Sequence, residues 1–322
     1  MNSSLNGRRA RPLDRKMVAM GIACLLAVAA VPGRGEGAPA QKPPTTAEIL
    51  AAAKTDDWRA LDPENTLYLE MASGRVVIEL APAFAPQHVA NVKALAREKY
   101  FDGLAIVRVQ DNYVVQWGDP NAEDPARARK IVNGKRTLAA EFDRACGDEV
   151  PFTPLPDGDV YAPEVGFVNG FPAARDKASG RLWLVHCYGM VGAGRGDTAD
   201  SGGGAEDYVV IGHAPRHLDR NCTLFGRVVQ GIEHLSSLPR AGGPMGFIEK
   251  PEQYIPIRSI RVAADVPPAE RSELEILRTD TETFRRLVEA RRSRSEEWFL
   301  HKPGRVELCN VPVPVRAKTG GN

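Results

Sequence analysis

Two short apolar runs, separated by three polar residues, constrain the fold of this chain more than any other stretch. Residues 106–109 and 113–117 are rich in β-branched and aromatic side chains, and Gln110, Asp111 and Asn112 lie between them. Strand-forming runs joined by a short polar connection are typical of an antiparallel hairpin. The pattern therefore predicts a hairpin with a three-residue loop.

That loop length sets an expected register. Arg108 would lie opposite Val114, and Ile106 opposite Gln116. Because side chains alternate between the two faces of a strand, Arg108, Val114 and Gln116 would share one face of the pair. Spacing alone favours a solvent-facing strand surface as the explanation for this mixture of polar and apolar side chains.

With its neighbours, the hairpin resembles the signature of cyclophilin-type peptidyl-prolyl isomerases. The residues that carry the likeness are Phe101-Asp102-Gly103, then Arg108, then Gln116-x-Gly118-Asp119. Two further matches are Pro86-x-x-Val89-x-Asn91 and the Phe-Gly-x-Val-x-x-Gly segment at 225–231. The resemblance covers residues 65–265, with an insertion at about 120–180.

The resemblance implies an all-β fold, a closed eight-stranded antiparallel barrel capped by two helices. Short apolar runs without a repeating strand–helix–strand rhythm agree with a closed antiparallel barrel. The ranges expected to be strands include 67–71, 76–80, 182–185, 207–211, 224–229 and 257–262, and the expected helices end near 99 and span 232–238.

The resemblance also assigns roles to individual residues. Arg108 falls on the family's catalytic arginine, and Gln116 falls on the glutamine that positions it and contacts substrate. The positions expected to bind substrate are Tyr113, Val114, Val191, Gly192, Asp207, Val209, His217, Leu218 and Cys222.

Several of these positions depart from the family pattern. Asp207 stands where glutamine is common, and Val209 stands where phenylalanine usually forms the wall of the proline pocket. We therefore expect a wider pocket, an Asp207 carboxylate that competes with substrate for Arg108, and weaker turnover than in a typical member. His217 occupies a position often held by tryptophan, so weak cyclosporin binding is expected.

The function implied is isomerisation of Xaa-Pro bonds, assisting the folding of exported proteins. The partners would be unfolded or proline-containing polypeptides, and the reaction needs no metal or cofactor. A second hypothesis is a cyclophilin-like module that holds proline-containing segments, as a chaperone does, without useful turnover. A third is a structural envelope protein built around the C-terminal helix. The net charge of +1 gives no indication of a nucleic-acid partner, and nothing indicates an oligomeric state.

Residues 1–40 have the pattern of a secretory signal peptide. A basic start is followed by an apolar run at 17–31 and by Ala38-Pro39-Ala40, a small-residue cleavage site. The run is short for a membrane span, so we expect export, most simply to a bacterial periplasm, with no span after cleavage. An uncleaved N-terminal anchor is the alternative, and residues 41–64 are interpreted as a linker.

Two segments extend the minimal family pattern. Residues 143–174 are rich in Pro, Gly and acidic residues and are expected to form an inserted surface loop. In the extension 266–322, Thr279 and Glu282 predict a capped helix whose apolar stripe docks on the barrel. The alternative is headgroup or partner binding through the helix arginines Arg285, Arg286, Arg291, Arg292 and Arg294.

The glycine-rich stretch at 192–204 lacks the Lys-Ser/Thr of a phosphate-binding loop. It is interpreted as a flexible surface loop that flanks the active face.

Four cysteines follow the signal: Cys146, Cys187, Cys222 and Cys309. An oxidising compartment favours at least one disulfide, and Cys146–Cys309 is one of the pairings that the sequence leaves open. The alternative is a zinc site with His213, His217 and Cys222, or with His186-Cys187. It is disfavoured because the histidines lie between strands and no paired Cys-x-x-Cys is present.

Overall fold

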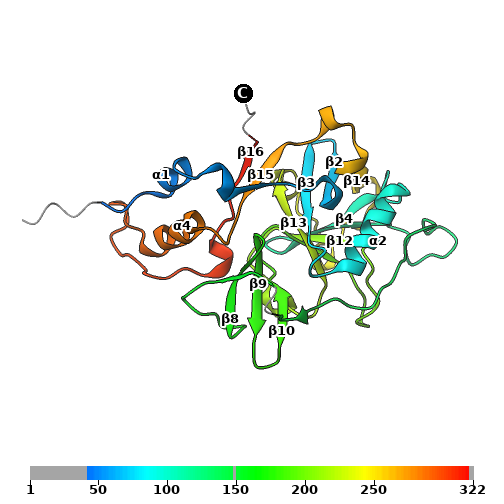
Figure 1. Ribbon diagram of the computed structural model, residues 1–322. Coiled ribbons are helices and arrows are strands. Elements are labelled where there is room, and N and C mark those ends of the chain that lie inside the picture. Colours follow the sequence, from blue (N-terminus) through cyan, green and yellow to red (C-terminus); the bar gives the residue numbers. More distant parts are fainter. Residues whose placement is uncertain (1–41, 148–149, 319–322) are drawn as a thin grey trace, which may run out of the picture. The chain divides into compact units, whose positions relative to one another are not determined.

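The structure is a computed structural model that describes residues 42–147 and 150–318 (Figure 1). The predicted signal peptide lies outside the described residues.

A closed antiparallel barrel forms the centre of the described chain, in the strand order β11-β12-β5-β4-β14-β2-β3-β13. This confirms the predicted eight-stranded fold class. The barrel strands are β2 (Thr66–Met71), β3 (Arg75–Leu80), β4 (Ala105–Val109), β5 (Val114–Gly118), β11 (Met190–Ala193), β12 (Asp207–Val210), β13 (Leu224–Gln230) and β14 (Ile255–Val262).

The barrel interior is filled by alternate strand residues and closed by two helices. α2 (Pro86–Arg97) contributes Val89, Val92 and Leu95 to this core, and α3 (Glu233–Ser236) contributes Leu235. The N-cap of α2 offers no side-chain hydrogen bond. Instead the Glu141 carboxylate accepts the first free backbone N–H groups of α2, at 2.9–3.0 Å.

The β4–β5 hairpin forms as expected, but its register differs. Arg108 lies opposite Gln116 rather than Val114, and the pairing shifts between Ile106 and Arg108. This bulge inserts an extra residue, Val107, into β4. At the turn, Gln110 N donates to the Val114 carbonyl, so the three loop residues are 111–113 rather than 110–112. Arg108 and Gln116 are therefore direct cross-strand neighbours on one face.

The insertion is a sheet, so the expectation of a surface loop is wrong. Its order is β6-β10-β9-β8-β7, and it lies below the barrel in Figure 1. The strands are β6 (Arg144–Ala145), β7 (Phe152–Pro154), β8 (Glu164–Val168), β9 (Phe171–Asp176) and β10 (Arg181–Leu184). Asn169 and Gly170, both at positive φ, make the tight turn between β8 and β9. β10, expected as a barrel strand, belongs to this sheet.

The segment interpreted as a linker is also structured. α1 (Thr46–Ala51) is followed by β1 (Trp58–Ala60), which pairs with β15 (Leu274–Leu277) of the C-terminal extension. β16 (Val315–Ala317) completes this three-stranded sheet. β1 and β16 lie near the two ends of the described chain and thus belong to one small sheet. Packing in one sheet shields the apolar residues of these strands from water.

α4 (Glu282–Ser293) is the predicted C-terminal helix, with a different cap and a different partner. Thr281, not Thr279, caps it by accepting the N–H of Phe284. The ring of Phe284 packs edge-on against Phe167 of the inserted sheet, with ring centroids 5.1 Å apart. The expectation of docking on the barrel is therefore wrong for this contact. Figure 1 shows α4 beside α1, away from the barrel strands.

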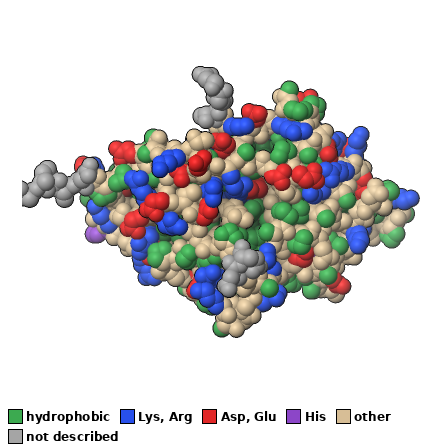
Figure 2. Space-filling view, viewed as in Figure 1, with side chains coloured by type: hydrophobic (Ala, Val, Ile, Leu, Met, Phe, Trp, Pro, Cys, Tyr) green, Lys and Arg blue, Asp and Glu red, His purple; other side chains and the backbone are tan. Residues whose placement is uncertain are grey.

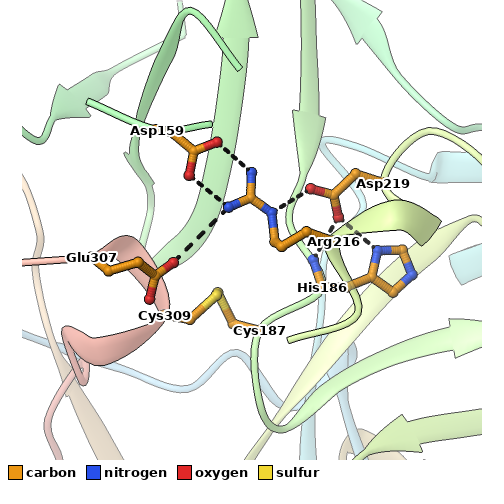
Figure 3. Close-up of a disulfide and its surroundings, with 7 residues drawn as sticks. All are labelled: Asp159, His186, Cys187, Arg216, Asp219, Glu307 and Cys309. Carbon is orange, nitrogen blue, oxygen red and sulfur yellow. Dashed lines mark hydrogen bonds and ion pairs between the residues drawn. A yellow bond between two sulfur atoms is a disulfide. The ribbon is translucent and has the colours of Figure 1, made fainter. Parts of the chain in front are cut away.

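The disulfide joins Cys187 to Cys309 (Figure 3). The pairing Cys146–Cys309 is wrong, since Cys146 and Cys222 are free thiols. The bond ties the C-terminal extension to the turn between the inserted sheet and β11.

Charges of both signs are interspersed on the face shown in Figure 2. Among the residues that the structure describes, no helix has the length and apolarity needed to cross a bilayer.

Removal of the disulfide is expected to destabilise the fold. Cys187→Ser and Cys309→Ser should each lower the free energy of unfolding by about 2–5 kcal/mol, because the bond closes a long loop in the unfolded chain. Urea titrations monitored by circular dichroism measure this. Cys146→Ser is the matched control, and a large loss in that variant together with none in Cys187→Ser would contradict the observed pairing.

Candidate active site

A pocket of about 250 Å³ opens on the outer surface of the barrel. Its walls come from β4, β5, β11, β12 and the short 3-10 helix Arg216–Leu218. The residues that line it are Arg108, Tyr113, Val114, Gln116, Ala193, Gly194, Arg195, Tyr208, Leu218 and Cys222. The start of the glycine-rich loop thus flanks the pocket.

Arg108 is the half-buried cation of this pocket, and three acceptors hold it. Its Nε donates to the Met245 carbonyl at 2.7 Å, and its Nη1 donates to Gln116 Oε1 at 3.0 Å. Its Nη2 donates to Gln110 Oε1. The guanidinium also lies over the rings of Tyr113 and Phe247, at 5.5 and 5.1 Å. Burial lowers the pKa of Arg108, but an arginine keeps its proton at neutral pH.

Gln116 connects Arg108 to a carboxylate that the sequence reasoning missed. The Gln116 side-chain amide donates to Glu206 Oε1. Burial raises the pKa of Glu206. Because the Glu206 carboxylate accepts a hydrogen bond from the Gln116 NH2 group, it orients that amide so that the carbonyl oxygen faces Arg108.

Apolar side chains form the opposite wall. Val114 and Leu218 line the pocket with the ring of Tyr113, and the ring of His217 stacks on Tyr113 at 6.4 Å between centroids. Cys222 completes this side as a free thiol. The structure thus brings together most of the side chains that the resemblance assigned.

Three of the assigned side chains point into the barrel and not toward the pocket. Val191, Asp207 and Val209 are at most 1 % exposed, and the two valines belong to the barrel core. The reason is register: Asp207 lies opposite Trp117 and Val209 opposite Val115, both of which point inward. Directly opposed residues share a face, so Asp207 and Val209 point inward too. Placing their side chains in the pocket was an error of one residue along β12.

The expected pairing of Asp207 with Arg108 is likewise wrong. The three acceptors of Arg108 are Met245, Gln116 and Gln110, and Asp207 Oδ1 is buried without a hydrogen-bond partner. Burial, with the nearby charge of Glu206, raises the pKa of Asp207 well above its usual value.

Tyr208 takes the place expected for Val209. It lies opposite Gln116, and its ring fills the pocket wall. Gly192 lies directly beneath that ring, where a Cβ would come within 2.5 Å of the phenol. Gly192 is therefore the residue that makes room for Tyr208, although its own atoms do not line the pocket.

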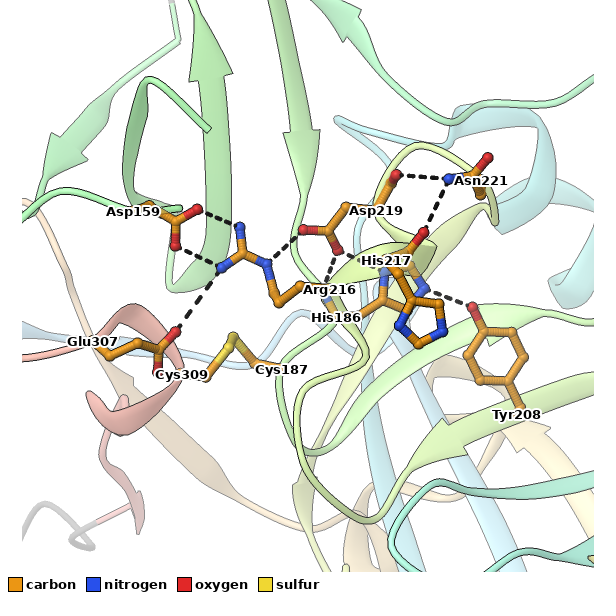
Figure 4. Close-up of polar contacts among 10 residues, drawn as sticks. All are labelled: Asp159, His186, Cys187, Tyr208, Arg216, His217, Asp219, Asn221, Glu307 and Cys309. Carbon is orange, nitrogen blue, oxygen red and sulfur yellow. Dashed lines mark hydrogen bonds and ion pairs between the residues drawn. A yellow bond between two sulfur atoms is a disulfide. The ribbon is translucent and has the colours of Figure 1, made fainter. Parts of the chain in front are cut away.

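A buried polar chain holds Tyr208 (Figure 4). His186 Nδ1 lies 2.9 Å from Asp219 Oδ1, and His186 Nε2 lies 2.8 Å from the Tyr208 hydroxyl. Because the carboxylate accepts the Nδ1 proton, Nε2 accepts the proton of the phenol. Burial lowers the pKa of His186 and raises that of Tyr208, so both stay neutral. The chain orients the ring and does not activate a nucleophile.

The residues considered for zinc have other contacts. Cys187 is in the disulfide, and His186 is bonded to Asp219 and Tyr208. In the described part of the chain, no three His, Cys, Asp or Glu side chains gather so as to hold a metal ion.

Of the residues that sequence reasoning missed, Glu206 and Tyr208 had a usable signal. Gln116 faces the pocket, so the residue opposite it on β12 must face the pocket as well. Gln110 and Met245 had no such signal, because the bulge and a distant loop place them. The geometry as a whole is that of a closed barrel with a fixed cation beside an apolar pocket on its outer surface.

The comparisons agree with this class. A family model described as cyclophilin type peptidyl-prolyl cis-trans isomerase/CLD matches residues 66–262. The chain belongs to this family.

Relatives match over different lengths. A probable peptidyl-prolyl cis-trans isomerase of Brucella suis is 47% identical over 91 residues, which are 26% of this chain and 46% of that protein. The chain thus spans about half the length of this relative. Human peptidyl-prolyl cis-trans isomerase-like 1 is 26% identical over 68% of this chain and 99% of its own length. The crystal structure of cyclophilin AquaCyp293 from Hirschia baltica has 26% identity and a TM-score of 0.66, and the match covers 84% of this chain and 97% of that one.

The buried Asp207 leads to a prediction about pH. In the unfolded chain this carboxyl titrates near pH 4. Its pKa is raised in the fold, so above pH 4 the folded state binds more protons, and this group lowers stability as pH rises. Asp207→Asn should remove that loss and raise the free energy of unfolding at pH 7 by about 1–3 kcal/mol.

Urea titrations between pH 4 and pH 8 check this, with exposed Asp200→Asn as the control. A variant less stable than the parent chain throughout that range would contradict the interior placement.

Proposed function

We propose that this protein is a peptidyl-prolyl cis-trans isomerase that acts on Xaa-Pro bonds. The single observation that carries the proposal is Arg108, held beside a 250 Å³ pocket with apolar walls. The relatives, which are named as isomerases and as a cyclophilin, support it.

The reaction itself sets what the site must supply. Rotation about an Xaa-Pro bond breaks amide resonance, at a barrier of roughly 18–20 kcal/mol. No covalent bond to carbon or nitrogen is exchanged, so the protein acts by binding the twisted state better than the planar one. A ten-thousandfold acceleration needs only about 5.5 kcal/mol of such differential binding.

The pocket is suited to hold the proline ring. Val114, Leu218 and the rings of Tyr113 and Tyr208 offer apolar surface on several sides. Because Tyr208 fills the wall that Val209 was expected to leave open, and Asp207 does not compete for Arg108, the reasons for expecting weak turnover no longer hold.

Arg108 is placed to stabilise the twisted bond. A guanidinium has five N–H groups, and acceptors among the described residues engage three of them. Two N–H groups remain for the substrate. One can donate to the prolyl nitrogen, whose lone pair becomes available only when resonance is broken. The fixed contacts to Gln116 and Met245 mean that this donor does not reorganise during the reaction.

We further propose that the clients are exported proteins. The signal-like residues 1–40 and the Cys187–Cys309 disulfide support an oxidising compartment outside the cytoplasm. The family membership fits proline-containing polypeptides as the substrate class.

Replacement of Arg108 tests the activity. Arg108→Ala should lower the catalysed exchange rate of an Ala-Pro peptide by roughly 10²–10³-fold, because it removes the donor to the twisted state. Peptide affinity should change by less than about fivefold, since the apolar walls remain. NMR exchange spectroscopy, which needs no protease, measures the rate, and chemical-shift titration measures the affinity.

Arg258→Ala is the matched control, because Arg258 is an exposed arginine on β14, outside the pocket. If the parent chain binds the peptide without accelerating exchange, the protein is a binding module and not an isomerase.

A further inference from the structure

A second and larger hollow, of about 920 Å³, lies beside the active-site pocket. We call it the tyrosine groove. It is bounded by the inserted sheet's β7–β8 connection, the loop Gly212–Ala214 and the tail at 305–310. The side chains that concern its function are Val160, Tyr161, Tyr188, His213, Arg216 and Arg305.

The groove exposes apolar side chains to solvent. Tyr161 is 56 % exposed, Tyr188 is 49 % exposed and Val160 is 93 % exposed. Tyrosines in such positions are typical of surfaces that bind polypeptides, because each offers a large contact area at a low entropic cost.

Tyr161 lies over an arginine, Arg216, whose carboxylate partners are drawn in Figure 3. The guanidinium of Arg216 lies 4.9 Å from its ring centroid. Two nearly buried carboxylates fix that guanidinium: Asp159 by two hydrogen bonds of 2.7 and 2.9 Å, and Asp219 by one of 2.6 Å. The side chains of Arg216 and Asp159 are only 5 % and 4 % exposed. The exposed ring therefore rests on a buried, fully paired cation.

Tyr188 is anchored differently. It follows Cys187, whose disulfide to Cys309 attaches the tail that forms the opposite bank of the groove. Glu307 on that tail lies 3.9 Å from Arg216. The ring of Tyr161 thus lies over a fixed cation and the backbone of Tyr188 is held by the neighbouring disulfide, which reduces the order that a ligand must impose.

One loop lies between the groove and the active-site pocket and borders both of them. Gly212, His213, Ala214 and Arg216 face the groove, whereas Leu218 lines the pocket. The same loop is tied to the pocket's hairpin, because Ile211 N donates to the Tyr113 carbonyl at 2.8 Å.

Beneath the loop, the chain Arg216–Asp219–His186–Tyr208 runs from the groove to the pocket wall (Figure 4). A polypeptide whose proline occupies the pocket has the tyrosine groove as the adjoining hollow.

We propose that the tyrosine groove is a second subsite, which binds the extended segment flanking the client's proline and prefers aromatic or large apolar side chains there. The inference rests on the proposed function, because it takes a proline in the pocket as its reference point. Asp159 and Arg216 are paired with each other, so the exposed tyrosines and Val160 offer apolar contact, beside the charges of Arg305 and Glu307 on the tail.

The experiment compares labelled peptides that share one Ala-Pro core. One peptide has the core alone, and two carry an added segment with Phe and Leu, either before or after the proline. Fluorescence anisotropy on the full chain gives the ratio of the core Kd to the extended Kd. We expect one extension to tighten binding by about tenfold and the other to have little effect.

Variants of the two tyrosines test whether the groove causes the gain in peptide affinity. Tyr161→Ala combined with Tyr188→Ala should bring the ratio close to one, and the pair Tyr161→Phe with Tyr188→Phe should retain most of it. Trp298→Ala, which removes an aromatic side chain that is 83 % exposed outside the groove, is the matched control and should keep the full ratio.

Three outcomes would overturn the inference: no gain with either extension, a gain that survives the double alanine variant, or tyrosine variants that change only self-association in sedimentation velocity. The last would assign the groove to a second copy of the chain. The ratio is measured without turnover, so an inactive enzyme with a tyrosine-dependent ratio would refute the proposed function alone. An active enzyme with a ratio of one would refute the subsite alone.

Discussion

The hydrogen bond between Arg108 and Gln116 across β4 and β5 is the contact on which the site depends. It exists because alternate side chains of a strand point to opposite faces, which in a closed barrel are the interior and the outer surface. The Val107 bulge sets Arg108 directly opposite Gln116. From that pair outward, register determines that Tyr208 lines the pocket and that Asp207 does not.

Sequence reasoning succeeded where the informative residues lie at fixed offsets within one hairpin. Arg108, Tyr113, Val114 and Gln116 could be placed around one pocket because no loop of unknown length separates them. It failed on β12, because the glycine-rich loop before that strand does not show which of its alternate residues face outward. An error of one residue therefore placed Val209 in the pocket wall instead of Tyr208. The outward-facing residues of β12 could have been identified by requiring that the residue opposite Gln116 face outward.

The other errors have a common physical origin. Short strands carry weak periodicity, so the inserted sheet was mistaken for a loop, although the Asn169-Gly170 turn was a usable hairpin signal. β1 and β15 are far apart in sequence, and neither segment indicates that it will pair with the other. The four thiols gave no preference for Cys187, because pairing depends on which segments the fold brings together.

The insertion and the segments outside the barrel at both ends of the described chain also contribute to the structure around the pocket. Phe167 of the insertion and Phe284 of α4 belong to the same apolar cluster as Val114 and Tyr208, the outward-facing residues of the pocket wall. The wall is therefore supported from behind by segments outside the minimal barrel. The likeness to AquaCyp293 covers 84% of the chain, more than the matched family region, which agrees with these segments being part of one fold.

The spacing of the disulfide also has a consequence for biosynthesis. Cys309 follows Cys187 by 122 residues, so at about 5–20 residues per second the ribosome delivers the second thiol roughly 6–24 seconds after the first. During that interval Cys146 is already present and Cys222 is synthesised, so both are free to react with Cys187 before Cys309 arrives. Formation of the observed pair then requires either rapid burial of Cys187 or later exchange of a wrong disulfide for the Cys187–Cys309 bond.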